Sequence, residues 1–354
     1  MRQCNRRNGL IDLLRFLASI IIVLTHFGIS GSLKFFGGAI FVEFFFLLSG
    51  YYGMVFLHDK PFVIPQGSTL EQEIGTYCKK KYFKMFPYVL EGVCLYYVSY
   101  WLEYGSSVKD IIKTSAFIPL ETALLGLTGA SQVHAGVYWY LSGLFIVLPI
   151  FMWLSVKVAS IFFNYLVVFV PWIMHGYLFY KYGTLRIPTS GFDIFFRVSG
   201  DFLFSGLLYL IVRVLKRQRF SRRGKWIMTI TAVGSFGAAL SLTMRQSLTK
   251  SRYEEIFVVL VMLSLALTLS EQLLICNLDI PLFTILAKLS LPIYIFHWPI
   301  FTILKTLIFQ EGYTNDFRIA IGLVVTFLVS GLFIVFNEKI GTTLMTRVKE
   351  LFLS

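Results

Sequence analysis

The chain has 354 residues, of which 56% are hydrophobic, 17% aromatic and 14% charged, and its net charge is +13. About a quarter of the residues of a soluble domain are charged, so this composition excludes a soluble globular enzyme. Apolar stretches recur from end to end, each near the roughly 20 residues that a helix needs to cross a bilayer. We therefore predict an all-α, polytopic membrane protein, with one transmembrane domain over residues 1–354 and no appended soluble domain.

About ten membrane spans are predicted, with short connections. Their ranges are 10–29, 36–57, 84–103, 137–156, 160–180, 194–214, 226–244, 256–275, 288–309 and 318–337. Alternate connections hold most of the lysines and arginines, above all the segment 213–225, and such a bias marks cytoplasmic loops. Both termini are therefore expected in the cytoplasm, and the net charge does not indicate a nucleic acid partner.

The first span reads "GLIDLLRFLASIIIVLTHFG" and carries charge at both ends. Asp12 lies one turn before Arg15 and can pair with it. His26 follows Arg15 by eleven residues, or three turns, so both lie on nearly the same helix face, with a rise of about 16 Å between them. Two interpretations fit: a catalytic route with His26 as general base, or a snorkelling arginine with an interfacial histidine.

The second span reads "FVEFFFLLSGYYGMVF". Glu43 is an acid in a phenylalanine-rich helix, and a charged group in lipid requires a partner. His26 or His297 are the partners expected for it. Ser49 and Gly50 form a small pair, which favours close helix packing over chemistry.

The segment "KKKYFKMFPYVL" leads into the third span. Lys80, Lys81 and Lys84 can share a helix face, and a basic cluster suits a phosphate-rich ligand. Topology or anionic lipid is the alternative explanation of such a cluster, and the sequence alone favours that alternative.

Two later segments contain aromatic and histidine side chains. "VYWYLSGLFIV" places Trp139 between Tyr138 and Tyr140, a pattern typical of an interfacial aromatic belt. "LAKLSLPIYIFHWPIF" places His297 near the middle of the ninth span.

The remaining candidates are isolated. Glu338 lies at the inner boundary of the last span, and His175 in the fifth span has a structural interpretation. His58 and His134 are expected in loops, without a role.

Together these segments resemble the acyltransferase-3 family of bacterial membrane acyltransferases. "DLLRFLASIIIVLTH" is similar to its first-helix signature, and "VEFFFLLSGYY" to its second-helix motif. "KKKYFKMFPYVL" resembles its basic cluster, with lysines where arginine is commoner, and "YWYLSGLF" and "LSLPIYIFHWPI" resemble later landmarks. The five segments occur in order over the whole chain.

The resemblance implies transfer of an acyl group, usually acetyl, from cytoplasmic acyl-coenzyme A to a hydroxyl of a cell-envelope carbohydrate or glycolipid. Acyl-coenzyme A would be a co-substrate, with no permanently bound cofactor and no metal. It would bind Arg15, Lys80, Lys81 and Lys84, with His26 and Glu43 as catalytic residues. Asp12, Ser49, Trp139, His297 and Glu338 are candidate supporting residues. The expected location is the bacterial cytoplasmic membrane, with glycan-assembly enzymes as candidate partners.

Two readings from other classes remain open at this point. A carrier that moves a glycan lipid or an acyl donor would also bury charges in the membrane, although it would usually show repeat symmetry. A structural partner in an envelope complex would leave the charges of the first span unexplained.

Overall fold

The computed structural model describes residues 8–27, 35–59, 67–105, 107, 109, 137–186, 193–245, 253–275, 280–309 and 313–341. Within these ranges the regular structure is entirely helical. The helices are α1 (Gly9–Phe27), η2 (Gly38–Phe41), α2 (Val42–His58), α3 (Leu70–Tyr104), α6 (Trp139–Lys157), α7 (Ala159–Ile161), η3 (Phe162–Leu166), α8 (Val167–Tyr182), α9 (Asp193–Arg217), α10 (Arg222–Arg245), α11 (Glu254–Leu269), α12 (Pro281–Leu307), α13 (Asn315–Phe336) and η4 (Asn337–Gly341). Each of the ten predicted spans contains a helix.

Helix α3 is longer than the predicted third span. It begins at Leu70, where the Thr69 side chain accepts from the Gln72 backbone and the Gln72 side chain accepts from the Thr69 backbone. This reciprocal cap satisfies backbone donors that a helix start otherwise leaves unpaired. The lysine-rich segment is therefore helical, and not a separate short element before the span.

Eight helical segments in the described ranges are long and apolar enough to cross a membrane. They are Gly9–Phe27, Gly38–His58, Trp139–Lys157, Ala159–Tyr182, Asp193–Arg217, Arg222–Met244, Pro281–Leu307 and Asn315–Lys339. Helix α11 falls short with 16 residues, and α3, with 35 residues, is not among the eight. The multi-pass class is thus confirmed, while the count of ten spans and the orientation of the termini stay predictions.

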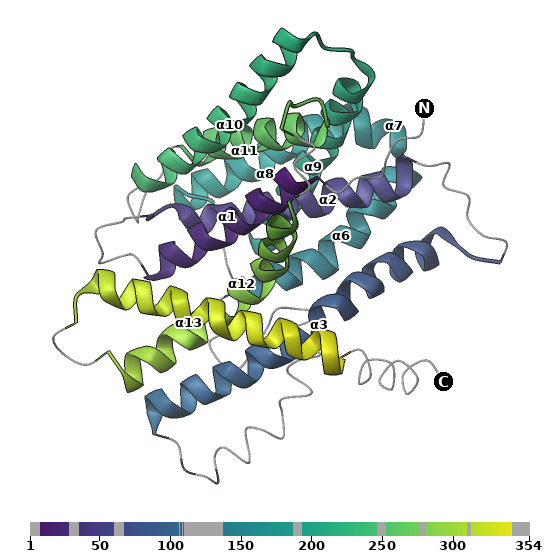
Figure 1. Ribbon diagram of the computed structural model, residues 1–354. Coiled ribbons are helices and arrows are strands. Elements are labelled where there is room, and N and C mark those ends of the chain that lie inside the picture. Colours follow the sequence, from purple (N-terminus) through teal and green to yellow (C-terminus); the bar gives the residue numbers. More distant parts are fainter. Residues whose placement is uncertain are drawn as a thin grey trace.

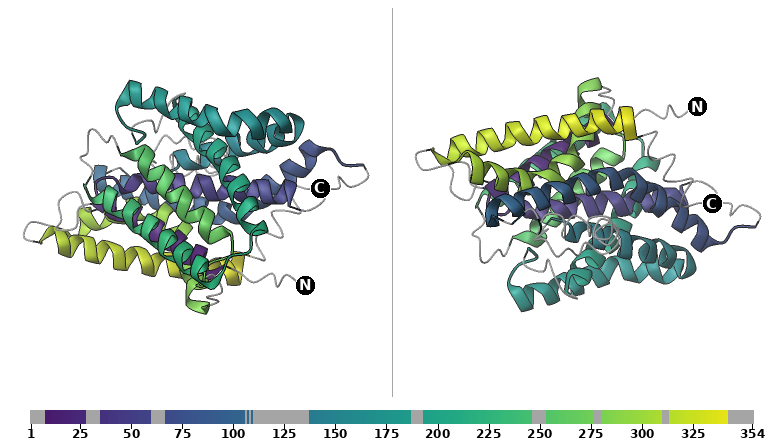
Figure 2. Two further views of the ribbon diagram at one scale, coloured as in Figure 1. Left: turned by 90° about the horizontal axis from the view of Figure 1, so that it is seen from above. Right: turned by 90° about the horizontal axis from the view of Figure 1, so that it is seen from below.

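Helices α1 and α2 form the centre of the molecule. Helix α2 packs against α9 and α6, and α1 packs along α12, which in turn contacts α3 and α13 (Figure 1). Of the apolar stretch that includes α2, 72% is buried, against 28% for those that include α8 and α13. Figure 2 shows α8 and α13 at opposite edges of the bundle. Helix α2, which carries Glu43 and Ser49, is therefore far better shielded from the surroundings than the helices at the edges.

Candidate active site

Two histidines meet where the end of α1 crosses α12. The rings of His26 and His297 stack with centroids 5.2 Å apart and an interplanar angle of 27°. Trp298 presents its edge to His26 at 5.1 Å, and Phe27 lies 5.8 Å from the His297 ring. His26 keeps partial exposure, whereas His297 is fully buried. The structure thus brings together two side chains that the sequence places 271 positions apart.

The hydrogen bonds of His297 define its protonation. Its Nδ1 lies 2.7 Å from the carbonyl oxygen of Tyr294 and 3.3 Å from that of Ile293. A carbonyl oxygen only accepts, so Nδ1 carries the proton, and in a neutral ring Nε2 then holds the free lone pair. Nε2 is buried and has no hydrogen-bond partner among the described residues. This pair of rings therefore includes a nitrogen able to accept a proton.

A cluster of cations lies near the other end of α1. Arg15 pairs with Asp12 at 3.8 Å, as predicted, and lies close enough to Lys81 of α3 for the two charges to repel. Burial, together with the charges of Arg15 and Lys84, lowers the pKa of Lys81 to about 8. Lys80 and Lys84 are exposed, whereas Lys81 is half-buried. The predicted donor-binding residues thus come from two helices that are far apart in the sequence.

The partner of Glu43 is Arg197 of α9, so the expectation that Glu43 pairs with His26 or His297 is wrong. Arg197 Nε donates to Glu43 Oε1 at 2.6 Å, and Nη2 forms an ion pair with the same oxygen. Glu43 is completely buried and Arg197 is 1% exposed. The physical reason is that a carboxylate removed from water is stabilised more by a permanent cation than by a neutral imidazole.

Further buried charges extend this ion pair through α9. Asp201 follows Arg197 by one helical turn and is completely buried. His175, fully buried on α8, lies between Asp201 at 3.5 Å and Glu255 at 3.2 Å. His175, predicted to be structural, is thus part of a charged network. Arg197 and Asp201 were missed, although two charges one turn apart in an apolar span are a readable signal.

The aromatic residues at the start of α6 do not form an interfacial belt. Tyr138, Trp139 and Tyr140 are 1%, 9% and 7% exposed, respectively. The guanidinium carbon of Arg197 lies 4.5 Å from the centre of the Trp139 ring, which is cation–π geometry. These residues are core residues because a charged group needs polarisable cover there, and the expectation of a belt is wrong.

The other candidates lie apart from the histidine pair. Ser49 lies beside the Tyr140 side chain. Glu338 accepts from Lys288 at 2.6 Å at an exposed position. His58 ends α2 and its Nε2 lies 3.0 Å from Ser155 Oγ, so its expected place in a loop is wrong. His134 lies outside the described residues.

Two groups of side chains with different chemistry lie at different positions along α1. Cations suited to phosphate lie near its first turns, and imidazoles suited to proton transfer lie about 16 Å further along the helix. In the part of the chain that the structure describes, no three His, Cys, Asp or Glu side chains gather as a metal site. The geometry therefore fits general-base chemistry on a long anionic substrate that lies along α1.

Comparison with known proteins agrees with this chemistry. The acyltransferase domain of the acyltransferase-3 family matches residues 8–335, nearly the whole chain. No curated protein and no solved structure matches the chain. The match includes α1, α2, α3 and α12, and it places the histidine pair and the cations inside one family domain. The chain belongs to the acyltransferase-3 family, and it is a membrane acyltransferase.

Proposed function

We propose that this protein transfers an acyl group, most simply acetyl, from cytoplasmic acyl-coenzyme A to a hydroxyl of a cell-envelope carbohydrate or glycolipid. The observation that carries the proposal is the layout of α1, with Arg15 beside Lys81 at one depth and His26 beside His297 at another. One extended donor that lies along α1 would contact both groups.

The cations are the proposed site for the phosphates of the donor. Repulsion between Arg15, Lys81 and Lys84 is relieved when an anion binds among them, and each charge-assisted hydrogen bond contributes roughly 1.5–3 kcal/mol. From there the pantetheine arm follows α1 and places the thioester near His26. Lipid or topology alone would not require Arg15, on a different helix, to join the lysines.

The reaction proposed is a direct transfer. His26 takes the proton of the acceptor hydroxyl while that oxygen attacks the thioester carbonyl carbon. The tetrahedral intermediate collapses, the carbon–sulfur bond breaks, and the thiolate of coenzyme A receives the proton from the imidazolium. His26 is the proposed base because it retains exposed surface, which a group that contacts the acceptor needs. His297 is completely buried and has a positioning role beneath it.

The deciding measurement is the release of free coenzyme A. The full chain in lipid nanodiscs would receive acetyl-coenzyme A with and without an envelope glycan, and free thiol would be followed. We expect acceptor-dependent thiol release together with acetylated glycan. Transport of either substrate across proteoliposomes without thiol release would instead establish a carrier and overturn the proposal.

The donor side also requires the proposed orientation in a bacterial cytoplasmic membrane. Ser221, exposed between α9 and α10, lies in the densest basic segment. A Ser221→Cys variant in a cysteine-free background should resist an impermeant thiol reagent in intact cells and react after lysis. Labelling in intact cells would invert the topology and remove the cytoplasmic donor.

A further inference from the structure

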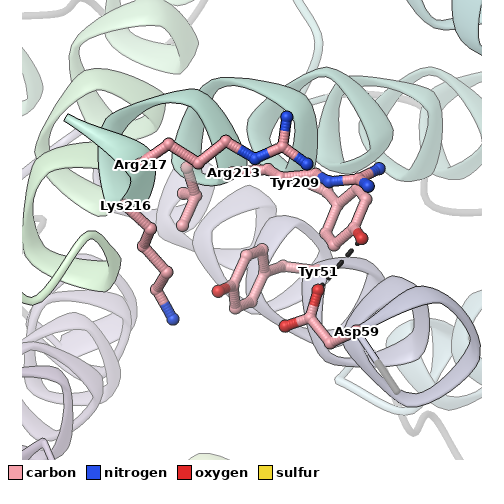
Figure 3. A pocket seen from close by; sticks show the side chains of 7 residues that line it. Tyr51, Asp59, Tyr209, Arg213, Lys216 and Arg217 are labelled. Carbon is pink, nitrogen blue, oxygen red and sulfur yellow. Dashed lines mark hydrogen bonds between the residues drawn. The ribbon is translucent and has the colours of Figure 1, made fainter. Parts of the chain in front are cut away.

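A pocket opens where α2 and α9 end, away from the histidine pair. It has a volume of about 240 Å³, and its polar lining consists of Tyr51, Asp59, Tyr209, Arg213, Lys216 and Arg217. Figure 3 shows the three cations projecting from the last turns of α9, across from Tyr51 and Asp59 of the α2 end. In the proposed orientation this pocket faces the cytoplasm.

The cations of this pocket are only partly neutralised. Arg213 and Arg217 are four residues apart, so they are neighbours on one helix face, where like charges destabilise each other. Neither forms an ion pair with another described residue, whereas Lys216 pairs with Glu271 at 3.1 Å. Both arginines are exposed and free to close on a ligand.

Asp59 is the one acidic side chain of the pocket lining, and a neighbouring tyrosine reduces its repulsion of a bound anion. The Tyr209 hydroxyl donates to Asp59 Oδ1 at 3.0 Å and so engages that carboxylate. The Tyr51 hydroxyl points toward the Lys216 ammonium in Figure 3. One carboxylate against three cations leaves the lining positive, with two phenol groups beside them.

Topology and the helix dipole account for cations here, but not for their arrangement. Cations at a helix end or in an inner loop need only be near the membrane surface. Arg219, Arg222, Arg223 and Lys225 meet that need a few residues later. Arg213 and Arg217 instead line a cavity, and a guanidinium fork matches the oxygen pairs of a phosphate.

We propose that this pocket binds a phosphate group of an anionic ligand, as a site additional to the donor-phosphate site at Arg15, Lys81 and Lys84. The phosphate is supplied either by the nucleotide of an acyl donor or by an anionic phospholipid headgroup. The nucleotide source rests on the proposed function, and the lipid source does not. The site is distinct from the lysines of α3, because no residue of α3 lines the pocket.

The test compares Arg213→Gln/Arg217→Gln with Arg222→Gln/Arg223→Gln, which removes the same charge from exposed arginines outside the pocket. The probes are 3′,5′-ADP, titrated in phosphatidylcholine nanodiscs, and phosphatidylglycerol, counted as bound lipid by native mass spectrometry. We expect the pocket variant to weaken at least one probe tenfold or more, and the control to stay within twofold of the parent.

The outcomes distinguish a nucleotide ligand from a lipid ligand, and they distinguish failure of the phosphate site from failure of the transferase proposal. Loss confined to 3′,5′-ADP assigns the nucleotide, and loss confined to phosphatidylglycerol assigns lipid. Equal losses in both variants, or no saturable binding of either probe to the parent, overturn the phosphate site. Thermal unfolding of each variant verifies folding, and thiol release by the parent is measured separately, so failure of the transferase proposal is recognised on its own.

Discussion

Glu43 and Arg197, separated by 154 positions in the chain, form a buried ion pair between α2 and α9. Asp201 lies one turn further along α9, on the same side as Arg197, and is completely buried. Arg197 compensates the charge of Glu43 and connects α9 with the central helix α2.

Loss of Arg197 is expected to destabilise the protein more than loss of the Glu43 charge. Arg197→Met leaves the buried Glu43 carboxylate uncompensated, and breaking a buried pair costs about 3–5 kcal/mol. Glu43→Gln keeps the shape and an oxygen that accepts from Arg197, whose guanidinium also stays over the Trp139 ring. Thermal unfolding in detergent should rank the variants in this order, with Glu43→Gln/Arg197→Met less damaging than the sum of the single changes.

The matched control is the pair of Lys181 and Asp193, in which the lysine is exposed and its Nζ lies 2.5 Å from Asp193 Oδ2. Exposed pairs contribute about 0–1 kcal/mol, so Lys181→Met should barely change the unfolding midpoint. Equal shifts for Arg197→Met and Lys181→Met would contradict a central role for the buried pair.

Gly50 sets the distance between α2 and α9. A Cβ atom at this position would lie 1.9 Å from Ser205 Oγ and 2.7 Å from Ser205 Cβ. Gly50→Ala should therefore destabilise by about 1–3 kcal/mol, as overpacking does, and Ser205→Gly should partly restore the double variant.

Gly176 on α8 is the control for that change, since a Cβ there meets nothing within 4 Å. Alanine is about 1 kcal/mol better than glycine in a helix, so Gly176→Ala should raise the unfolding midpoint while Gly50→Ala lowers it. Shifts of the same sign at both positions would rule out the close approach.

The sequence predicts the helices better than the contacts between them. Hydropathy places a helix in every predicted span, because the length of an apolar run reflects the thickness of a bilayer. The Asp12–Arg15 pair was also predictable, since residues three apart on a helix are neighbours. The partner of Glu43 was not, because helical periodicity says nothing about which distant helix brings a cation. The burial of Trp139 escaped prediction for the same reason: an aromatic cluster at a span end looks identical whether it faces lipid or protein.

The donor affinity should depend on pH through Lys81. Its pKa is about 8 in the free protein, below the usual 10.5, and a phosphate nearby raises it. Binding therefore takes up a proton, and the KM for acetyl-coenzyme A should rise as the pH increases through 8. The same lowered pKa makes the folded state gain stability as the pH rises between about 8 and 10.5, because the unfolded chain binds more protons there.

Lys81→Arg tests this directly, because arginine stays charged over that range. The variant should show a flatter dependence of KM on pH, whereas Lys79→Arg, at an exposed position on the same helix, should keep the profile of the parent. An unchanged profile in Lys81→Arg would remove Lys81 from the donor site.

The two histidines have separable roles in the proposed reaction, and their variants should differ in kind. His26→Ala removes the base and should lower turnover by about 10²–10⁴-fold, with donor binding nearly unchanged, because the cations lie about 16 Å away along α1. His297→Asn keeps a donor for the Tyr294 carbonyl and removes the free Nε2 beneath His26. It should lower turnover less and shift the pH profile of turnover, because it changes the surroundings of the base and not the base itself.

His58→Ala is the control for general effects of losing an imidazole. His58 is the last residue of α2, where its ring contacts Ser155, and its loss should leave the pH profile of turnover unchanged. Acetyl transfer to the glycan and 3′,5′-ADP binding, measured on the same preparations, separate chemistry from donor binding. If His297→Asn loses as much turnover as His26→Ala, the unpartnered Nε2 of His297 is the base, and the acceptor must enter the space between α1 and α12.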